Sequence, residues 1–378
     1  MKVSVISVGE FHARHIANQC ERLGILDKFC TTHLENKEKK NKSIVYLPYI
    51  ETFYFRFSNI WGNAYYFNYK FRIPIADYYF SKNITKSDLL HIVSNCMPKS
   101  IENAVQNRHK YIIDLGTIHN SDQKKIIDEE YELLNISRHK INNVYRTKTE
   151  NQALKELEEA QNIIVPNDFV KISLENNGFN PASIKINPYG FDDMFVQNEN
   201  NYSGDSFRIV YAGRISILKG VHYLIQAFRE LSLEDSELLL CGPIESSLKK
   251  VVGDVPSNIK FLGQLSRATL SGIFSKSTIY VHPSLFEGSS ISIYEAMASG
   301  LPIIATENSG SVIRDGSDGF IIPIRDVKIL KEKILFFYHN QDKVHEMGKN
   351  SKEWVKNFSW NKYGERLLNI YEQILGEV

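Results

Sequence analysis

The sequence predicts an α/β protein built from two doubly wound parallel sheets. Short β-branched runs alternate with longer amphipathic stretches along the chain, which is the pattern of parallel α/β architecture. The runs are apolar on both faces, as strands are when helices cover both sides of a sheet. With 378 residues, the chain is also longer than one hydrophobic core usually serves. We therefore expect two domains.

The expected strands follow one another at spacings that leave room for a helix between most of them. In the N-terminal half they are 3–8, 89–93, 111–115 and 162–165; in the C-terminal half they are 208–212, 237–241, 259–262, 279–282, 303–305 and 319–322. The polar insert 198–205, preceded by Pro188 and Gly190, cannot build core. It places the domain boundary within 187–206. We assign residues 1–190 to the first domain and 191–357 to the second.

The composition fits a soluble globular protein, with 43% hydrophobic and 24% charged residues. A formal net charge of +1 gives no indication of a nucleic-acid partner. The cysteines have neither CxxC pairing nor metal-ligand spacing; they are Cys20, Cys30, Cys96 and Cys241. The first apolar run is too short for a signal peptide, and no stretch approaches the roughly 18 apolar residues of a spanning helix. We expect a cytoplasmic protein with reduced thiols and no zinc site.

The loop after the strand 208–212 combines glycines with two cations. Gly213 lets the backbone turn tightly and approach a ligand closely, and Arg214 and Lys219 follow before Gly220. At the carboxyl edge of the sheet, such cations suit a diphosphate: arginine offers a planar fork and lysine a mobile point charge. A loop with solvated basic residues is the alternative.

A second segment, 286–302, places carboxylates beside a helix N-terminus. Gly288, Ser289 and Ser290 are expected to begin this helix, where unpaired N–H groups and the positive end of the dipole face an anion. Glu287 and Glu295 are separated by seven residues. Carboxylates repel phosphates, so sugar and ribose hydroxyls are their natural partners. The alternatives are a capping contact for Glu287 and a solvated helix face for Glu295.

Together these segments resemble the retaining glycosyltransferases of family four, within the glycosyl transferases of group 1. The resemblance rests on the Glu-x7-Glu spacing, the Gly-Arg-x4-Lys-Gly loop and the run Ala-Met-Ala-Ser-Gly-Leu-Pro-Ile-Ile-Ala-Thr at 296–306. The segments 281–284 and 315–323 are also similar, so that the match covers nearly all of 207–325. It implies the GT-B fold, in which two Rossmann-like domains face each other across a cleft. It also implies a nucleoside-diphosphate sugar donor and retention of the anomeric configuration.

The resemblance also implies roles for individual residues. In the family pattern, Arg214 and Lys219 contact the donor diphosphate. Glu287 binds the sugar hydroxyls, and Glu295 binds the ribose. Gly213, Gly288, Ser289 and Ser290 shape the phosphate site, and Gly242 and Leu265 line the nucleoside, Leu265 through its backbone. His119 occupies the position of the family's active-site histidine, which hydrogen-bonds the donor sugar. The implied catalytic set is therefore His119, Arg214, Lys219 and Glu287.

The N-terminal half carries a weaker resemblance. Gly9 follows the first strand, where such enzymes place a glycine loop that faces donor and acceptor, and Glu10, His12 and Arg14 are surface residues in the alternative interpretation. For His119, a helix-capping role is the alternative, and Asp114 is a rival at the end of the same strand. Glu129 and Glu130 are expected to be solvated charges on the next helix. The segment 358–378 resembles the family's terminal helix, which packs back on the first domain.

Residues 53–80 contain 13 aromatic side chains, with Arg56, Lys70 and Arg72 opposed only by Asp77. One interpretation is a core-packing and loop segment rich in tyrosine. The other is an acceptor-side surface that contacts an anionic membrane or a lipid-linked glycan, since amphipathic aromatics favour interfaces. Peripheral contact with the inner face of a membrane therefore stays open.

The expected reaction is transfer of a hexosyl group from a UDP-, GDP- or ADP-linked sugar to a glycan or lipid-linked glycan, in surface polysaccharide biosynthesis. We expect no metal and no other cofactor, because Arg214, Lys219 and the helix N-terminus can stabilise the leaving diphosphate and no Asp-x-Asp motif occurs. A phosphorylase-like or epimerase reaction on the same scaffold is one alternative. A non-catalytic nucleotide-sugar-binding or scaffold protein is the other.

Overall fold

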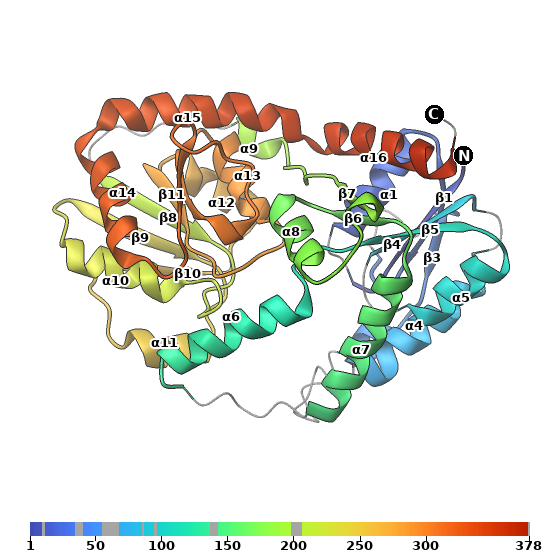
Figure 1. Cartoon of the computed structure of the whole chain (residues 1–378). Helices are drawn as coiled ribbons and strands as arrows, with labels where there is room; N and C mark the ends of the chain where they lie inside the picture. Colours follow the sequence, from blue (N-terminus) through green and yellow to red (C-terminus); the bar gives the residue numbers. More distant parts are fainter. Residues whose placement is uncertain are drawn as a thin grey trace.

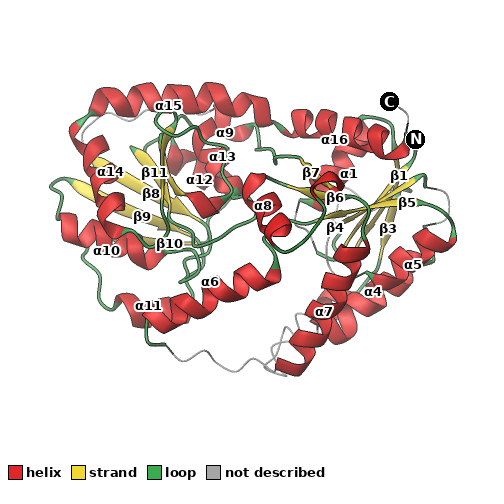
Figure 2. Cartoon of the chain, viewed as in Figure 1, coloured by secondary structure: helices red, strands yellow, loops and turns green. Residues whose placement is uncertain are grey.

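The computed structural model describes residues 1–9, 12–34, 41–54, 68–84, 87–93, 97–136, 143–197 and 206–376, without the side chains of residues 69 and 143–150. In these residues the chain forms two parallel sheets, each covered by helices on both faces (Figure 1, Figure 2). The two-sheet α/β prediction is confirmed.

The N-terminal sheet has the strand order β3-β2-β1-β4-β5-β6-β7. Its strands are β1 (Val3–Ser7), β2 (Leu26–Thr31), β3 (Ile44–Tyr46), β4 (Leu89–Val93), β5 (Lys110–Asp114), β6 (Ile163–Val165) and β7 (Ile184–Ile186). The chain leaves β1 for one side of the sheet and crosses to the other side at β4. The space beyond the carboxyl ends of β1 and β4 is therefore the switch point at which doubly wound sheets bind ligands.

The C-terminal sheet repeats this arrangement with the order β10-β9-β8-β11-β12-β13. Its strands are β8 (Phe207–Ala212), β9 (Ser236–Cys241), β10 (Ile259–Gly263), β11 (Ile279–His282), β12 (Ile303–Thr306) and β13 (Gly319–Ile322). All six expected strands are found within about one residue of their predicted bounds. β8 and β11 pair at its switch point.

The helices connect these strands. In the first half they are α1 (Ala13–Arg22), α4 (Ile73–Ser81), α5 (Pro98–Gln106), α6 (Asn120–Leu133), α7 (Asn143–Glu159), α8 (Asp168–Asn176) and α9 (Met194–Gln197). In the second half they are α10 (Val221–Leu231), α11 (Ser246–Val252), α12 (Arg267–Phe274), α13 (Ile291–Ala298), α14 (Val327–His339), α15 (Gln341–Val355) and α16 (Trp360–Leu375). A π-helical turn (Asn68–Arg72) and 3-10 turns at Pro181–Ser183, Glu307–Ser309 and Lys356–Phe358 complete them.

Two helices cross between the halves. Figure 1 shows α15 and α16 running in line along one side of the molecule, and α16 packs against α1 of the first half, where Gly364 leaves room for Gln19. Arg366 donates to Asn187 Oδ1 at 3.0 Å and to the carbonyl of Pro188 at 2.8 Å. These contacts tie the terminal helix to the chain that joins the two sheets.

Helix α6 makes the second crossing, and it corrects an expectation. Glu130 is buried, not solvated, because α6 lies against α10 of the other half. Its carboxylate lies 2.9 Å from His222 Nε2, accepts from Tyr223, and pairs with Arg325 Nε at 2.7 Å. Glu129 also pairs with Arg325 but stays 43% exposed, as expected.

The aromatic segment divides between core and surface where it is described. Phe80 is fully buried, whereas Phe53 and Tyr78 are more than half exposed, and Asp77 caps α5 through the N–H groups of residues 99 and 100. Residues 55–67, including Arg56, lie outside the described residues. Membrane or acceptor contact stays a prediction. Within the described part of the chain, no helix has the length and apolar character that crossing a bilayer requires.

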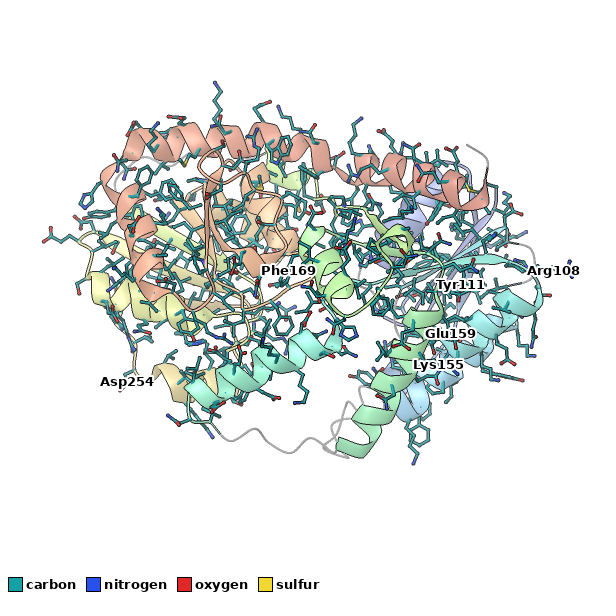
Figure 3. The ribbon with its side chains drawn as sticks, viewed as in Figure 1. Arg108, Tyr111, Lys155, Glu159, Phe169 and Asp254 are labelled. Carbon is teal, nitrogen blue, oxygen red and sulfur yellow. The ribbon has the colours of Figure 1, made fainter. Side chains whose placement is uncertain are left out.

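Helices α7 and α8 flank the N-terminal sheet. The hydroxyl of Tyr111 on β5 donates to the carbonyl of Glu159 at the end of α7, at 3.3 Å, and Figure 3 shows the two residues together. Phe169 on α8 lies near the junction of the two halves in the same view. Helix α8 therefore lies between the N-terminal sheet and the site described next (Figure 1, Figure 3).

Candidate active site

Three glycine-bearing loops lie side by side at the carboxyl edge of the C-terminal sheet. The N–H of Gly213 donates to the carbonyl of Cys241 at 2.9 Å, and the N–H of Gly242 donates to that of Gly263 at 2.8 Å. Gly213 and Gly242 have φ values of 147° and 144°, and a methyl group on Gly242 would lie 1.9 Å from the carbonyl oxygen of Gly213. Only glycine permits this approach. Leu265, in the third loop, packs against the core.

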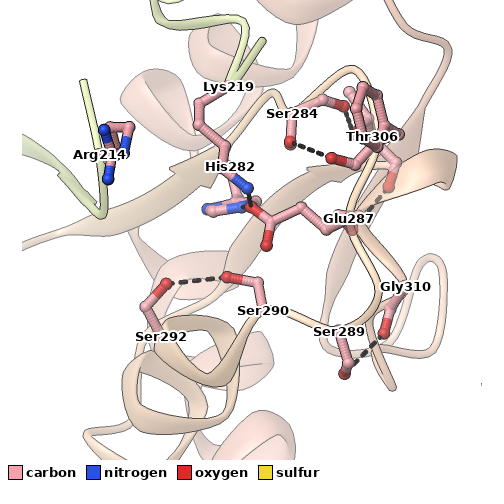
Figure 4. Close-up of polar contacts among 12 residues, drawn as sticks. Arg214, Lys219, His282, Ser284, Glu287, Ser289, Ser290, Ser292, Thr306 and Gly310 are labelled. Atoms are coloured by element: carbon pink, nitrogen blue, oxygen red, sulfur yellow. Dashed lines mark hydrogen bonds and ion pairs between the residues drawn. The ribbon is translucent and has the colours of Figure 1, made fainter. Parts of the chain in front are cut away.

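The first of these loops carries the two predicted cations. Gly220 ends it with φ 63° against the carbonyl of Pro283, which fixes the loop beside β11. Lys219 reaches the carboxylate of Glu287, with its Nζ 2.7 Å from Oε1. Arg214 is exposed and stands apart from this pair in Figure 4. The structure therefore brings Lys219 and Glu287 together and leaves the guanidinium of Arg214 on the same edge, open to solvent.

Glu287 is a charged side chain with two partners and little exposure. His282 Nε2 lies 2.7 Å from the Oε1 that also binds Lys219, and the side chain is 13% exposed. Burial raises the pKa of this carboxyl, but His282 and Lys219 outweigh burial and lower the pKa to about 2. The carboxylate is therefore ionised at neutral pH. It makes these side-chain contacts in place of the capping alternative.

Sequence reasoning missed the role of His282. Apart from the family resemblance of the segment 281–284, its only signal is its position, directly after a buried strand and before Pro283. Its Nδ1 lies 3.1 Å from the hydroxyl of Tyr280, which also lies 2.7 Å from the hydroxyl of Ser292. This chain of contacts fixes the imidazole that holds Glu287.

The predicted helix N-terminus is formed by α13. Ser290 is its N-cap residue, and its hydroxyl lies 2.9 Å from that of Ser292. The hydroxyl of Ser289 donates to the carbonyl of Gly310 at 3.1 Å. Gly288 touches the other half of the molecule, since a methyl group there would lie 1.7 Å from the carbonyl oxygen of Gly116. The start of α13 thus lies where the two halves meet.

Asn167, the N-cap residue of α8, makes a second contact at this place. Its Nδ2 donates to the carbonyls of Gly288 and Gly310, the latter at 3.1 Å. No local pattern indicates this contact, because the partners of Asn167 lie more than 120 residues away along the chain.

Glu295 is buried in α13, so it does not belong to a solvated helix face. Arg267 donates to its Oε1 at 2.6 Å and lies 3.4 Å from Asp192. Burial raises the pKa of Glu295 to about 7, although Arg267 opposes this. Glu295 is therefore a carboxyl that exchanges its proton near neutral pH. Arg267, which begins the helix after the third loop, was not anticipated.

The predicted residues of the N-terminal half lie at the facing edge. Gly9 has φ 105°, and its N–H donates to Thr32 Oγ1 at 3.1 Å. His119 is the N-cap residue of α6, where Nδ1 accepts from the N–H of Ser121 at 3.3 Å and the ring packs against Phe179. Burial lowers the pKa of His119. This is the capping arrangement, and contact of His119 with a donor sugar stays a prediction.

His12 does not fit the surface alternative. His12 is 7% exposed, and its Nε2 lies 2.8 Å from Asp114 Oδ2. Glu10 lies outside the described residues. No three His, Cys, Asp or Glu side chains of the described ranges gather as a metal-ligand set.

Comparison with known proteins identifies the family of the C-terminal half. Residues 193–354 match the model of the glycosyl transferases group 1. An uncharacterized glycosyltransferase of Methanocaldococcus jannaschii is 26% identical over 370 residues, which cover 95% of this chain and 93% of the relative. A phosphatidyl-myo-inositol mannosyltransferase of Mycobacterium leprae is 26% identical over 162 residues, covering 41% of this chain and 43% of the relative.

Solved structures agree on the fold. HepE of Anabaena, in complex with UDP, superimposes with a TM-score of 0.73 at 13% identity, over 99% of this chain and all of that one. A glycosyltransferase of Rickettsia africae superimposes with a TM-score of 0.68 at 18% identity, over 99% of this chain and 98% of that one. The C-terminal half of the chain is thus similar to the glycosyl transferases group 1, and the chain is a glycosyltransferase of GT-B fold.

Proposed function

We propose that this enzyme transfers a hexosyl group from a nucleoside-diphosphate sugar to a hydroxyl of a glycan or lipid-linked glycan, with retention of the anomeric configuration. The observation that carries the proposal is the ion-paired Glu287 beside the start of α13, with Lys219 on one side and the glycine loops on the other. The site combines groups for a diphosphate with an ionised acceptor for sugar hydroxyls.

The diphosphate is held by positive charge. The N-terminus of α13 offers backbone N–H groups and the positive end of its dipole, and Arg214 adds an exposed guanidinium at the same edge. Charge that develops on the leaving diphosphate is stabilised by these groups and by Lys219. We propose that they act without a metal ion.

The two glutamates hold the sugars. Glu287, ionised at neutral pH, accepts hydrogen bonds from hydroxyls of the transferred sugar, and Lys219 orients it. Glu295 binds the ribose hydroxyls. In this structure Arg267 donates a hydrogen bond to the Glu295 carboxyl. The nucleoside therefore either binds this carboxyl together with Arg267 or displaces Arg267 from it.

Transfer with retention needs no enzymatic nucleophile in this proposal. The acceptor oxygen forms a bond to the anomeric carbon on the face that the diphosphate leaves. The bond from that carbon to the phosphate oxygen breaks, and the acceptor proton passes to a phosphate oxygen. The protein contributes positioning and electrostatic stabilisation.

Relatives support the substrate classes. HepE is solved with UDP and with UDP-glucose, which supports a uridine nucleotide among the candidate donors. The mycobacterial relative is named for mannosyl transfer to phosphatidyl-myo-inositol, which supports a lipid-linked acceptor. A role in surface polysaccharide biosynthesis at the cytoplasmic face of a membrane fits both and belongs to the proposal.

The test is turnover of UDP-, GDP- and ADP-sugars, with and without EDTA, by the wild type and by Arg214→Ala and Lys219→Ala. One donor should be turned over in an EDTA-insensitive manner, and each substitution should lower the rate about 100-fold or more. Lys331→Ala, which removes an exposed pair with Glu230, is the matched control. Full activity in both site variants would refute their assignment. Donor binding without turnover would favour the non-catalytic alternative.

A further inference from the structure

A buried polar cluster lies at the carboxyl edge of the N-terminal sheet, outside the donor residues described above. Asp114 Oδ2 lies 2.8 Å from His12 Nε2 and 3.1 Å from His91 Nε2. His91 Nδ1 lies 2.6 Å from the hydroxyl of Tyr371 on α16. Burial raises the pKa of Asp114, but His12 and His91 outweigh it and hold that pKa well below its usual range. Asp114 is therefore an ionised carboxylate inside the protein.

The directions of the hydrogen bonds follow from these partners. An ionised carboxylate only accepts, so both histidines donate to it from Nε2. In a neutral imidazole the other nitrogen is then an acceptor. His91 uses its Nδ1 to accept from Tyr371. A neutral His12 in this tautomer likewise offers Nδ1 as an acceptor, and a hydroxyl group is a suitable donor to it.

His12 lies beside the contact between the two halves. A methyl group on Gly116 would lie 3.8 Å from His12 Cε1, the ring carbon between Nδ1 and Nε2. Gly116 in turn touches Gly288 at the start of α13. Tyr189, from the chain that joins the sheets, packs on the imidazole with ring centroids 4.5 Å apart. A single residue thus separates His12 from the loop that carries Glu287.

Asp114 also has a feature that packing alone does not explain. Its second oxygen, Oδ1, is buried and has no hydrogen-bond partner in the described residues. Leaving a buried polar atom unpaired is costly, so a purely structural carboxylate here would be disfavoured. Orienting a functional imidazole and fixing its tautomer accounts for its presence.

We propose that His12 binds a substrate hydroxyl through Nδ1, and that Asp114 is the positioning residue that fixes its tautomer and orientation. This inference rests on the proposed function and adds a specific contact from the N-terminal half. The hydroxyl belongs to the transferred sugar or to the acceptor, since both present the same O–H group where the halves meet. The histidine anticipated from the sequence for such a contact was His119.

The experiment uses the nucleotide sugar that the donor panel identifies and octyl glucoside as the hydroxyl probe. Donor hydrolysis, transfer to the probe and affinity for the free nucleoside diphosphate are measured for the wild type and His12→Ala. His339→Ala, an exposed histidine at the end of α14, is the control. The diphosphate affinity should stay within twofold, because its groups lie in the other half.

His12→Ala should lower at least one rate by tenfold or more. Loss of transfer alone assigns the hydroxyl to the acceptor, and loss of both rates assigns it to the donor sugar. His12→Asn, which keeps an acceptor oxygen near the position of Nδ1, should recover part of the loss. Both rates within twofold of the wild type in His12→Ala would overturn the inference while leaving the proposed function standing. A wild type that turns over no donor would overturn the proposed function itself.

The role of Asp114 is tested by non-additivity. Asp114→Asn should lower the same rate as His12→Ala, and the double variant should lose no more than His12→Ala alone. Losses that multiply in the double variant would show that Asp114 acts independently of His12, and would overturn its positioning role.

Discussion

Replacing Lys219 with methionine removes one of the two partners of a nearly buried carboxylate and keeps the length of the side chain. The pKa of Glu287 falls from 4.5 to about 2, and the shift corresponds to about 3 kcal/mol in favour of the ionised form. His282 and Lys219 share this effect, so the variant should lose about 2 kcal/mol of unfolding free energy at pH 7.5.

The pH dependence of this loss has a defined sign. Because the pKa of Glu287 is lower in the folded protein, its contribution is present above pH 4.5 and disappears as the pH falls towards 2. The difference between Lys219→Met and the wild type should therefore be constant above pH 4.5 and narrow below it.

Urea unfolding followed by circular dichroism measures this difference. Lys331→Met is the control, because its pair with Glu230 is more exposed and is screened by solvent. If Lys219→Met were no less stable than Lys331→Met at pH 7.5, the ion pair at the centre of the site would not exist as described.

Three further substitutions test other parts of the account. Glu295→Gln should raise the melting temperature at pH 8 but hardly at pH 5. Burial raises the pKa of this carboxyl to about 7, so its ionisation destabilises the fold as the pH rises from 4.5 through 7. An equal effect at both pH values would contradict this reasoning. Glu130→Gln should cost about 3 kcal/mol in thermal unfolding, because it breaks the buried ion pair with Arg325, whereas the exposed Glu129→Gln should cost less than about 0.5 kcal/mol. Similar losses in both variants would refute the buried pair. Gly288→Ala should lower donor turnover about tenfold or more, because a methyl group there overlaps the backbone of the other half, while Gly272→Ala, which faces open space, should not; undiminished turnover in Gly288→Ala would rule out this contact.

The central strands could be predicted because burial on both faces leaves a signal in the sequence itself. β8, β9 and β11 contain the continuous apolar runs 209–212, 238–241 and 279–281 between helices. The missed strands lack this signal: β2 carries Asp27 and Lys28 on a half-exposed surface, and β3 and β7 are edge strands of three residues each. Edge strands are short and have one open side, so their composition does not distinguish them from loops.

The candidate site divides in the same way. The sequence allowed Lys219, Glu287 and the start of α13 to be predicted, because their spacing along one loop and one helix places them together. Glu130 was misread as a surface charge, since its burial depends on α6 packing against the other half. His12 and Asp114 are 102 residues apart, and the sequence contains no local pattern that pairs them. Partners brought together by tertiary packing leave no trace in periodicity.

Binding of the free nucleoside diphosphate to the wild type and to Arg214→Met, measured by titration calorimetry with UDP, GDP and ADP, tests the central claim most directly. The account predicts that one diphosphate binds the wild type and that its affinity falls about tenfold or more in Arg214→Met, because a charge-assisted contact is lost. Lys331→Met should bind like the wild type. Equal affinity in wild type and Arg214→Met, or no binding of any of the three by the folded wild type, would contradict it.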